Sequence, residues 1–143
     1  MRIILADTAG FCMGVKRAVN IALELAGKQK GEIYTVGPLI HNPQAVEMLE
    51  RKGIKVIRDI SEVKSGTIII RAHGITPSEK SNIKQSGLEY FDATCPLVVR
   101  IQKTIKKYAD KGYSTVIVGD KGHAEVEGLL GYAEGKGIVI ERE

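Results

Sequence analysis

The chain has 143 residues, of which 43% are hydrophobic and 27% charged, and its formal net charge is +4. This composition is typical of a globular domain with a real core, and it excludes a disordered or membrane-embedded chain. The longest apolar runs, such as TIII and STVIVG, are far too short to span a bilayer. The first residues, MRIILADTAG, contain no signal-peptide core or cleavage site, so a cytoplasmic location is predicted.

The basic residues give little reason to expect a nucleic-acid partner. Lysines gather only in KTIKKYADK, a predicted helix face, and aromatic side chains are sparse. The small positive excess is most simply a solvated surface. The two cysteines argue against a disulfide framework in a cytosolic chain, and they leave four roles open: buried thiol, redox pair, nucleophile or metal ligand.

The first third of the chain is predicted to form two strands, each followed by a helix. RIILA (residues 2–6) is expected to be a buried strand, and residues 15–28 have apolar side chains at helical spacing. EIYTV (residues 32–36) is expected to be the second strand. A helix is then expected over residues 43–53, with Asn42 as its N-cap.

The rest of the chain continues this alternation. The expected strands are IKVI, TIIIR, LEYF, YSTVIVG and GIVIE. Helices are predicted over residues 76–87, 96–112 and 124–135, and the first of them begins with a capping box of Thr76 and Glu79. Near-continuous apolar strands that alternate with helices predict an α/β fold, in which helices cover both faces of a parallel sheet.

A boundary between two structural units is expected at residues 93–96, because about four strands precede it. Residues 1–95 are predicted to form a first α/β unit. Residues 96–143 contain only two predicted strands and two predicted helices, so they are expected to form the start of a second, incomplete unit.

Every cysteine and histidine is predicted to lie in a loop that leads from a strand into a helix. These residues are Cys12, His41, His73, Cys95 and His123. In parallel α/β sheets such loops share the edge at the carboxyl ends of the strands, where ligands bind. We therefore expect the five side chains to gather at one edge of the molecule.

The chemistry of that edge suits an anion. Helix N-termini offer unpaired N–H groups, and histidines add further donors, so a phosphate or diphosphate ligand is predicted. A cysteine at a helix N-terminus has a stabilised thiolate, which makes Cys95, followed by Pro96, a candidate metal ligand or nucleophile. Glu125, two residues after His123, is by itself most simply a first-turn acid that favours the helix dipole.

Several sharper motifs are absent from the sequence. HAE is not followed by the P-C-x-x-C of zinc deaminases, and there is no H-E-x-x-H. Cysteine phosphatases place an arginine six residues after the cysteine, where this chain has Ile101. Iron–sulfur ligation stays open, because two thiolates from separate loops can join a cluster if another segment supplies more ligands.

Five segments together resemble one family. GFCMGV, HNPQAVE, AHG, FDATCPLV and GHAEVEG occur in the order and at the spacings of the LytB-type 4-hydroxy-3-methylbut-2-enyl diphosphate reductases. The resemblance covers essentially the whole chain, and DATCP combined with GHxEVEG is very specific. One small departure is AGFCMGV, where members often have RGFCAGV.

The resemblance implies a cytoplasmic, oxygen-sensitive enzyme in which three similar α/β units surround a 4Fe-4S cluster held by three cysteines. Cys12 and Cys95 match the first two of these ligands, and the third has no counterpart in this chain. The chain is therefore expected to be an N-terminal fragment or truncated form with part of the machinery. By itself it is expected to bind a cluster unstably or not at all.

The resemblance also assigns roles to the polar residues. His41, His73 and His123 match the histidines that bind the substrate diphosphate, and Glu125 matches the acid of the proton relay. The implied reaction is a two-electron reductive dehydroxylation to isopentenyl and dimethylallyl diphosphates, with electrons from a ferredoxin or flavodoxin. Two other interpretations stay open: a non-catalytic module that holds a phosphate or diphosphate, and a cysteine-nucleophile or thiol-redox enzyme that uses Cys95.

Overall fold

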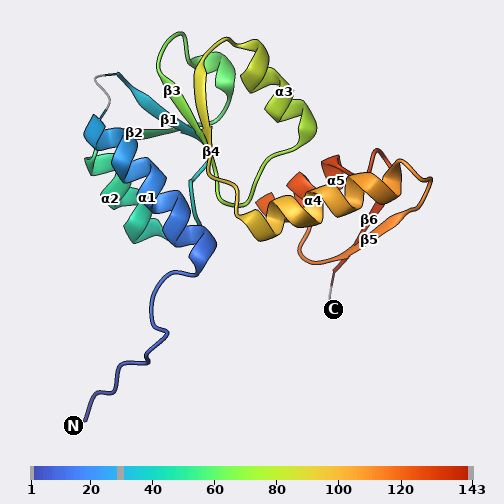
Figure 1. The fold of residues 1–143 in the computed structure, drawn as a ribbon, viewed down its shortest axis with the longest axis horizontal. Helices are drawn as coiled ribbons and strands as arrows, with labels where there is room; N and C mark the ends of the chain where they lie inside the picture. Colours follow the sequence, from blue (N-terminus) through green and yellow to red (C-terminus); the bar gives the residue numbers. More distant parts are fainter. Residues whose placement is uncertain (1, 29–30, 142–143) are drawn as a thin grey trace.

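In the computed structural model, which describes residues 2–28 and 31–141, strands form two parallel sheets with helices packed against them (Figure 1). The larger sheet has the spatial order β2-β1-β3-β4. Its strands are Ile33–Val36 (β1), Ile54–Ile57 (β2), Thr67–Ile70 (β3) and Glu89–Asp92 (β4). The smaller sheet pairs Thr115–Val118 (β5) with Gly137–Ile140 (β6). All the strand pairs are parallel, so the predicted α/β fold with parallel sheets is confirmed.

The helices follow the strands closely in sequence. They are Met13–Lys28 (α1), Pro43–Arg51 (α2), Pro77–Gln85 (α3), Pro96–Ala109 (α4) and Ala124–Gly131 (α5), with a short 3-10 helix at Ile60–Glu62 (η1). None of the helices in the described part of the chain is long and apolar enough to cross a membrane.

The central strand β3 separates two apolar cores. Ile69 packs with residues of α1 and α2 on one face of the larger sheet, and Ile68 and Ile70 pack with Ile83 of α3 on the other. Neighbouring isoleucines point to opposite faces because successive side chains of a strand alternate. All four residues of β3 are buried, as expected for a strand with helices on both sides.

Local signals set the helix ends as predicted. The side chain of Asn42 accepts a hydrogen bond from the N–H of Ala45 at 2.8 Å, which caps α2. Thr76 and Glu79 form the expected capping box at the start of α3. Because these caps satisfy backbone N–H groups that a helix leaves unpaired, short sequence motifs suffice to place them.

The segment expected to form the first strand does not form one. Ile3, Ile4 and Leu5 are 75–81% exposed, and neither sheet of the described residues includes this segment. A strand needs a neighbour for its backbone hydrogen bonds, and apolar content alone does not supply one. The strand prediction is therefore wrong for this structure. Cys12 consequently precedes α1 within an exposed segment and does not follow a strand.

The smaller sheet is covered differently from the larger one. On one side, Ile117 of β5 packs against a core of α4 and α5 residues that includes Val98 and Leu129. The other side exposes Val116, Val118, Ile138 and Ile140 by 50–68%. Among the described residues, helices therefore cover both faces of the larger sheet but one face of the smaller. Pro96 starts α4 directly after the β4 loop, and the division into units at residue 95 stays a prediction.

Helix α5 lies close to the loop that follows β3. A methyl group added at Gly128 would lie 3.8 Å from the backbone of His73, and one at Gly131 would lie 2.9 Å from Thr76 and Pro77. The first distance is ordinary van der Waals contact, whereas the second is too short for a side chain, so the packing of α5 requires glycine at Gly131. The N-terminus of α5, with His123, is thereby packed next to the loop of His73.

Replacing Gly131 by alanine should destabilise the fold by about 1 to 3 kcal/mol, because the added methyl would force α5 or the 76–77 segment to shift. Gly27→Ala in α1 is the matched control, since nothing lies within 4 Å of its added methyl. A higher helix propensity should make that control neutral or more stable by up to about 1 kcal/mol. Urea unfolding followed by circular dichroism measures both, and equal effects would contradict this packing.

Candidate functional site

Three histidines from three loops meet at the carboxyl ends of the strands. His41 lies between β1 and α2, His73 between β3 and α3, and His123 between β5 and α5. The ring centroids of His41 and His73 are 4.1 Å apart, those of His41 and His123 5.0 Å, and those of His73 and His123 6.0 Å. The expected gathering of the histidines at one edge is therefore confirmed.

His73 is the inner member of this cluster. It is half-buried, whereas His41 and His123 are exposed, and its Nδ1 has no hydrogen-bond partner among the described residues. Burial, together with smaller contributions from repulsion by the two other histidines and Arg71, lowers the pKa of His73 from 6.5 to about 4. The ring is thus neutral at neutral pH. A ligand that reached the unpaired nitrogen would remove the cost of leaving it unsatisfied.

His123 is held in one orientation by the first turn of α5. The backbone N–H of Glu125 donates to His123 Nδ1 at 3.2 Å. A neutral ring that accepts at Nδ1 has its proton on Nε2, which can then donate to a ligand. The Gly122 N–H donates to the Glu127 carboxylate at 3.3 Å and closes the loop. Glu125 itself is half-buried in the first turn of α5, so its predicted place at a helix start is confirmed.

Cys95 is anchored beside the histidine cluster by its backbone. Its N–H donates to the carbonyl of Ala72, the residue before His73, at 2.9 Å. It is the N-cap residue of α4, and its side chain makes no capping hydrogen bond. The thiol is free and partly exposed, so it is available to a ligand.

The N-terminus of α1 lies against the Cys95 side chain. A methyl group added at Gly14 would lie only 2.5 Å from Cys95 Sγ. Cys12 is two residues earlier, and its carbonyl accepts the first hydrogen bond of α1, from the Lys16 N–H at 2.9 Å. Both cysteines therefore lie at helix N-termini that contact one another, although Cys12 is exposed.

Cysteines at two helix N-termini that approach one another are suitable ligands for a thiophilic group such as an iron–sulfur cluster. In the part of the chain that the structure describes, no set of three or more His, Cys, Asp or Glu side chains could hold a metal ion. The two cysteines are therefore the right type of ligand for such a group, but they are too few to hold it by themselves. This agrees with the chain's having only two cysteines.

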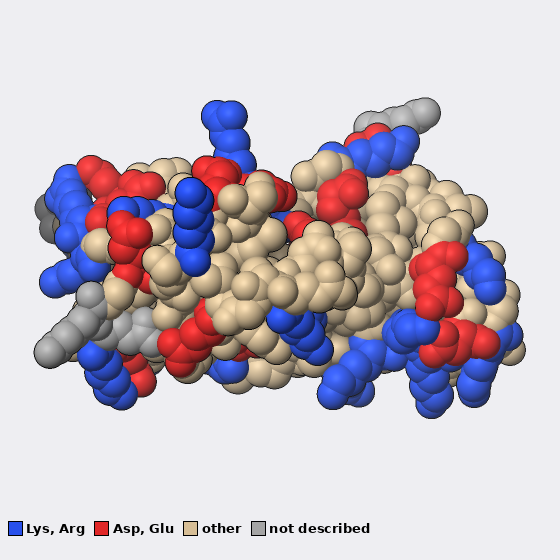
Figure 2. All heavy atoms as spheres, turned by 90° about the horizontal axis from the view of Figure 1, so that it is seen from above, with Lys and Arg blue, Asp and Glu red and all other residues tan. Residues whose placement is uncertain are grey.

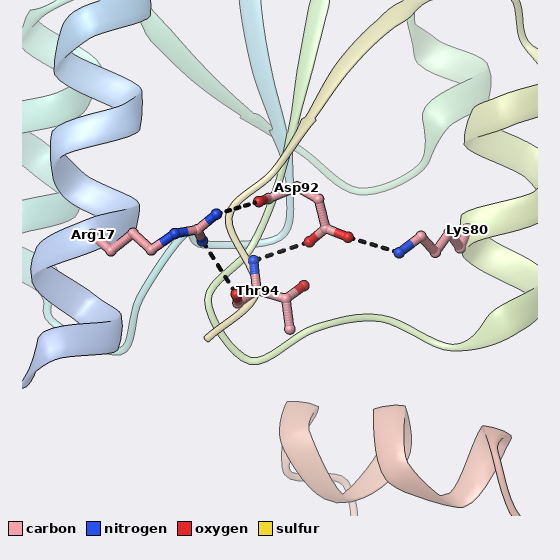
Figure 3. A network of polar contacts seen from close by, with 4 residues as sticks. All are labelled: Arg17, Lys80, Asp92 and Thr94. Atoms are coloured by element: carbon pink, nitrogen blue, oxygen red, sulfur yellow. Dashed lines mark hydrogen bonds and ion pairs between the residues drawn. The ribbon is translucent and has the colours of Figure 1, made fainter. Parts of the chain in front are cut away.

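Four further polar residues around Cys95 form a network that the sequence interpretation missed (Figure 3). They are Arg17 of α1, Lys80 of α3, Asp92 at the end of β4 and Thr94 of the loop before Cys95. Burial raises the pKa of Asp92, but hydrogen bonds from Lys80 and Thr94 outweigh it, and the pKa is lowered overall. Asp92 and Thr94 belong to the FDATCPLV motif, and that position was the only signal that could have identified them.

Arg71 is another residue that sequence reasoning passed over. Its Nε donates to the carbonyl of Gly74 at 3.1 Å, across the turn that contains His73. Gly74 has φ +76°, a left-handed conformation that favours glycine. The AHG motif thus combines a histidine with the glycine that its turn requires.

A family model described as LytB protein matches residues 3–143. The chain belongs to the LytB family. The curated 4-hydroxy-3-methylbut-2-enyl diphosphate reductase of Geobacter metallireducens is 47% identical over 143 residues, which cover 100% of this chain and 50% of that protein. The reductase of that name from Geobacter sulfurreducens is 49% identical over 140 residues, which cover 98% of this chain and 49% of the relative.

Solved structures give the same result. One, of (E)-4-hydroxy-3-methyl-but-2-enyl diphosphate reductase, the terminal enzyme of the non-mevalonate pathway, has a TM-score of 0.82 and 46% identity. The match covers 98% of this chain and 51% of that one. The E-1-hydroxy-2-methyl-but-2-enyl-4-diphosphate reductase from Plasmodium falciparum has a TM-score of 0.89 and 32% identity, over 94% of this chain and 42% of its own. The LytB chain thus spans about half the length of the curated relatives it matches.

The low pKa of His73 should make the stability of this LytB chain depend on pH. Because the pKa is about 4 in the fold and 6.5 ordinarily, the unfolded chain binds this proton more readily. The free energy of unfolding should be fully retained above pH 6.5 and fall as the pH drops toward 4. The loss should be about 2 kcal/mol, after allowance for the solvent that reaches the half-buried ring.

Urea unfolding of the unmodified chain and of His73→Asn, at several pH values across this window, measures the effect. The variant lacks the titrating ring, so its stability relative to the unmodified chain should rise as the pH falls. Parallel pH profiles for the two proteins would contradict a buried, neutral His73.

Proposed function

We propose that this LytB chain supplies the diphosphate-binding histidines, the proton-relay acid and two cluster ligands of a 4-hydroxy-3-methylbut-2-enyl diphosphate reductase. Reductases of that name are 47–49% identical to essentially the whole chain. The histidine cluster is the observation that carries the proposal: three imidazoles with centroids 4.1 to 6.0 Å apart lie beside the Cys95 loop. The expected place of action is the cytoplasm, in the non-mevalonate route to isoprenoids.

The histidine cluster suits the diphosphate group. His123 Nε2 can donate to a phosphate oxygen, and the unpaired Nδ1 of His73 gains a partner once an anion is bound. His41 and His123 lie at the N-termini of α2 and α5, where the helix dipoles favour negative charge. A bound anion would also offset the repulsion that lowers the pKa of His73, so binding should be coupled to proton uptake by that ring.

Cys12 and Cys95 would hold two corners of a 4Fe-4S cluster, with further ligands from outside this chain. When bound, the cluster supplies electrons and a Lewis-acidic iron for the substrate hydroxyl. Ferredoxin or flavodoxin would be the electron donor.

Glu125 would deliver the proton that lets the substrate hydroxyl leave as water. The C–O bond breaks, two electrons enter the allylic fragment, and a second proton forms a C–H bond at either end of it. The two protonation sites account for isopentenyl and dimethylallyl diphosphates as products. Glu125 fits this role because it is two residues from His123 and its own N–H orients that ring.

The same residues permit two rival interpretations. A non-catalytic module would bind the anion through the histidines and make no use of either cysteine. A cysteine nucleophile would require Cys95 but not Cys12. The position of Gly14 of α1 against Cys95 Sγ favours a joint role for the two cysteines over both rivals.

Activity is best tested in a chimera, in which residues 1–143 replace the matching half of the Geobacter sulfurreducens reductase. After anaerobic reconstitution with iron and sulfide, the chimera should convert the substrate. Glu125→Gln should lower kcat about 100-fold and change substrate affinity little, because it removes a proton donor and not a binding charge pair. Glu127→Gln is the control, since its amide oxygen can still accept from Gly122.

Cysteine variants of the chimera separate the rival interpretations. Cys12→Ser and Cys95→Ser should each remove the cluster absorbance together with turnover. Loss of activity in Cys95→Ser alone would support a nucleophile, and unchanged turnover in Glu125→Gln would contradict the proton role.

Pyrophosphate binding to the chain by itself tests the histidine cluster without the reaction. Calorimetry should detect binding that is tighter at about pH 6 than at about pH 8, because the anion raises the low pKa of His73 and draws a proton onto that ring. His73→Asn should weaken binding about tenfold, the value of one charge-assisted hydrogen bond. Lys84→Gln, which removes a positive charge in the last turn of α3, should have no effect. Absence of binding by the unmodified chain would contradict an anion site.

A further inference from the structure

The loop before Cys95 is held from two sides by charged side chains (Figure 3). From α1, Arg17 Nη1 donates to the Thr94 carbonyl and Nη2 to the Asp92 carbonyl, each at 3.2 Å. From α3, Lys80 Nζ donates to the Asp92 carboxylate at 2.7 Å. The other carboxylate oxygen of Asp92 accepts from the Thr94 N–H at 3.0 Å. We call Arg17, Lys80, Asp92 and Thr94 the Arg17 clamp.

The clamp adds to two backbone hydrogen bonds that this loop makes. The N–H of Ala93 donates to Ile70 at 3.1 Å, and the N–H of Cys95 donates to Ala72 at 2.9 Å. With the carbonyls of Asp92 and Thr94 bound to Arg17, the backbone leading into Cys95 is fixed on both sides. Cys95 therefore begins α4 from a rigid loop, while its own side chain makes no capping bond.

Arg17 also fixes the end of α1 that bears Cys12. Residues 2–12 are all exposed, so no buried contact of the preceding segment holds this helix end. The start of α1 is held by the packing of Val15 and Ala18 against the core, by the Gly14–Cys95 approach and by the two hydrogen bonds of Arg17. The same guanidinium thus ties the helix after Cys12 to the loop before Cys95.

Because Arg17 is exposed, we expect it to contribute more to the positions of the cysteines than to the free energy of folding. Its side chain borders a hollow of about 700 Å³ that Arg100 and Lys103 of α4 also line. Exposed polar contacts contribute little to the free energy of folding. Residues that orient metal ligands, in contrast, commonly change metal affinity by 10 to 100-fold when they are removed.

We propose that the Arg17 clamp is a positioning device that sets the separation of the Cys12 and Cys95 thiols. It depends on the proposed function only in taking these thiols as ligands of one group. The clamp holds the two helix starts in the arrangement that a shared thiophilic group requires. Arg17 is the decisive member, because among the four clamp residues it is the one that comes from α1.

Cadmium binding to the unmodified 143-residue chain tests the clamp without cluster or substrate. Reduced chain titrated with Cd²⁺ should show a thiolate-to-metal charge-transfer band that needs both cysteines, so Cys12→Ser and Cys95→Ser should each remove most of it. Arg17→Ala should weaken Cd²⁺ binding at least about tenfold. Arg100→Ala, which removes an arginine from the same hollow, should not weaken it.

Two further measurements distinguish positioning from loss of fold. Urea unfolding should show Arg17→Ala still folded under the titration conditions, and added guanidinium, at low millimolar concentration, should partly restore its affinity through the hollow. Arg17→Lys, which can reach only one of the two carbonyls, should bind Cd²⁺ with intermediate affinity, and it serves as the test if the alanine variant does not fold.

Equal Cd²⁺ affinity in the folded arginine variants and the unmodified chain would overturn the proposal, and so would a band that needs only one cysteine. These results are independent of the reductase assay. If the chimera were inactive but Cd²⁺ binding depended on Arg17, the proposed function would fail and the clamp would stand.

Discussion

The two backbone hydrogen bonds of Ala72 hold the candidate site together. Its N–H donates to the carbonyl of Leu39 at 3.0 Å, and its carbonyl accepts from the N–H of Cys95 at 2.9 Å. Both bonds lie just beyond the end of β3, and Ala72 is buried, so breaking either would leave a costly unpaired group. The loops of His41, His73 and Cys95 are thereby kept in fixed register.

Close contacts at glycines position two helices, α1 and α5, that these hydrogen bonds do not join to the site. Gly14 lets the start of α1 contact Cys95, and Gly131 lets α5 contact Thr76 and Pro77, which follow the His73 loop. Each approach adds a residue that the hydrogen bonds of Ala72 do not position, Cys12 in the first case and His123 in the second. The site therefore depends on positions where a side chain is missing as much as on those where one is present.

Two side chains proposed to face a ligand lack hydrogen-bond partners in the described part of the chain, whereas the backbone that supports them has such partners. Nδ1 of His73 has no partner among the described residues, and the side chain of Cys95 makes no capping bond. In the segment from Asp92 to Cys95, by contrast, two carbonyls accept from Arg17, and the N–H groups of Ala93 and Cys95 donate to the carbonyls of Ile70 and Ala72. A preorganised site requires this arrangement, in which side-chain groups are left open for a ligand while the backbone that carries them is held rigid.

The sequence by itself determined the local elements and the chemical types of the site residues. Caps at Asn42 and Thr76 follow from bonds within a few residues, and the strand-to-helix placement of the histidines follows from parallel topology. Tertiary structure alone decided that residues 2–6 form no strand, that Gly14 lies against Cys95, and that Arg17 joins two helix starts. These outcomes depend on contacts between segments that are distant in the sequence. The apolar pattern of one segment does not specify which other segment will pack against it.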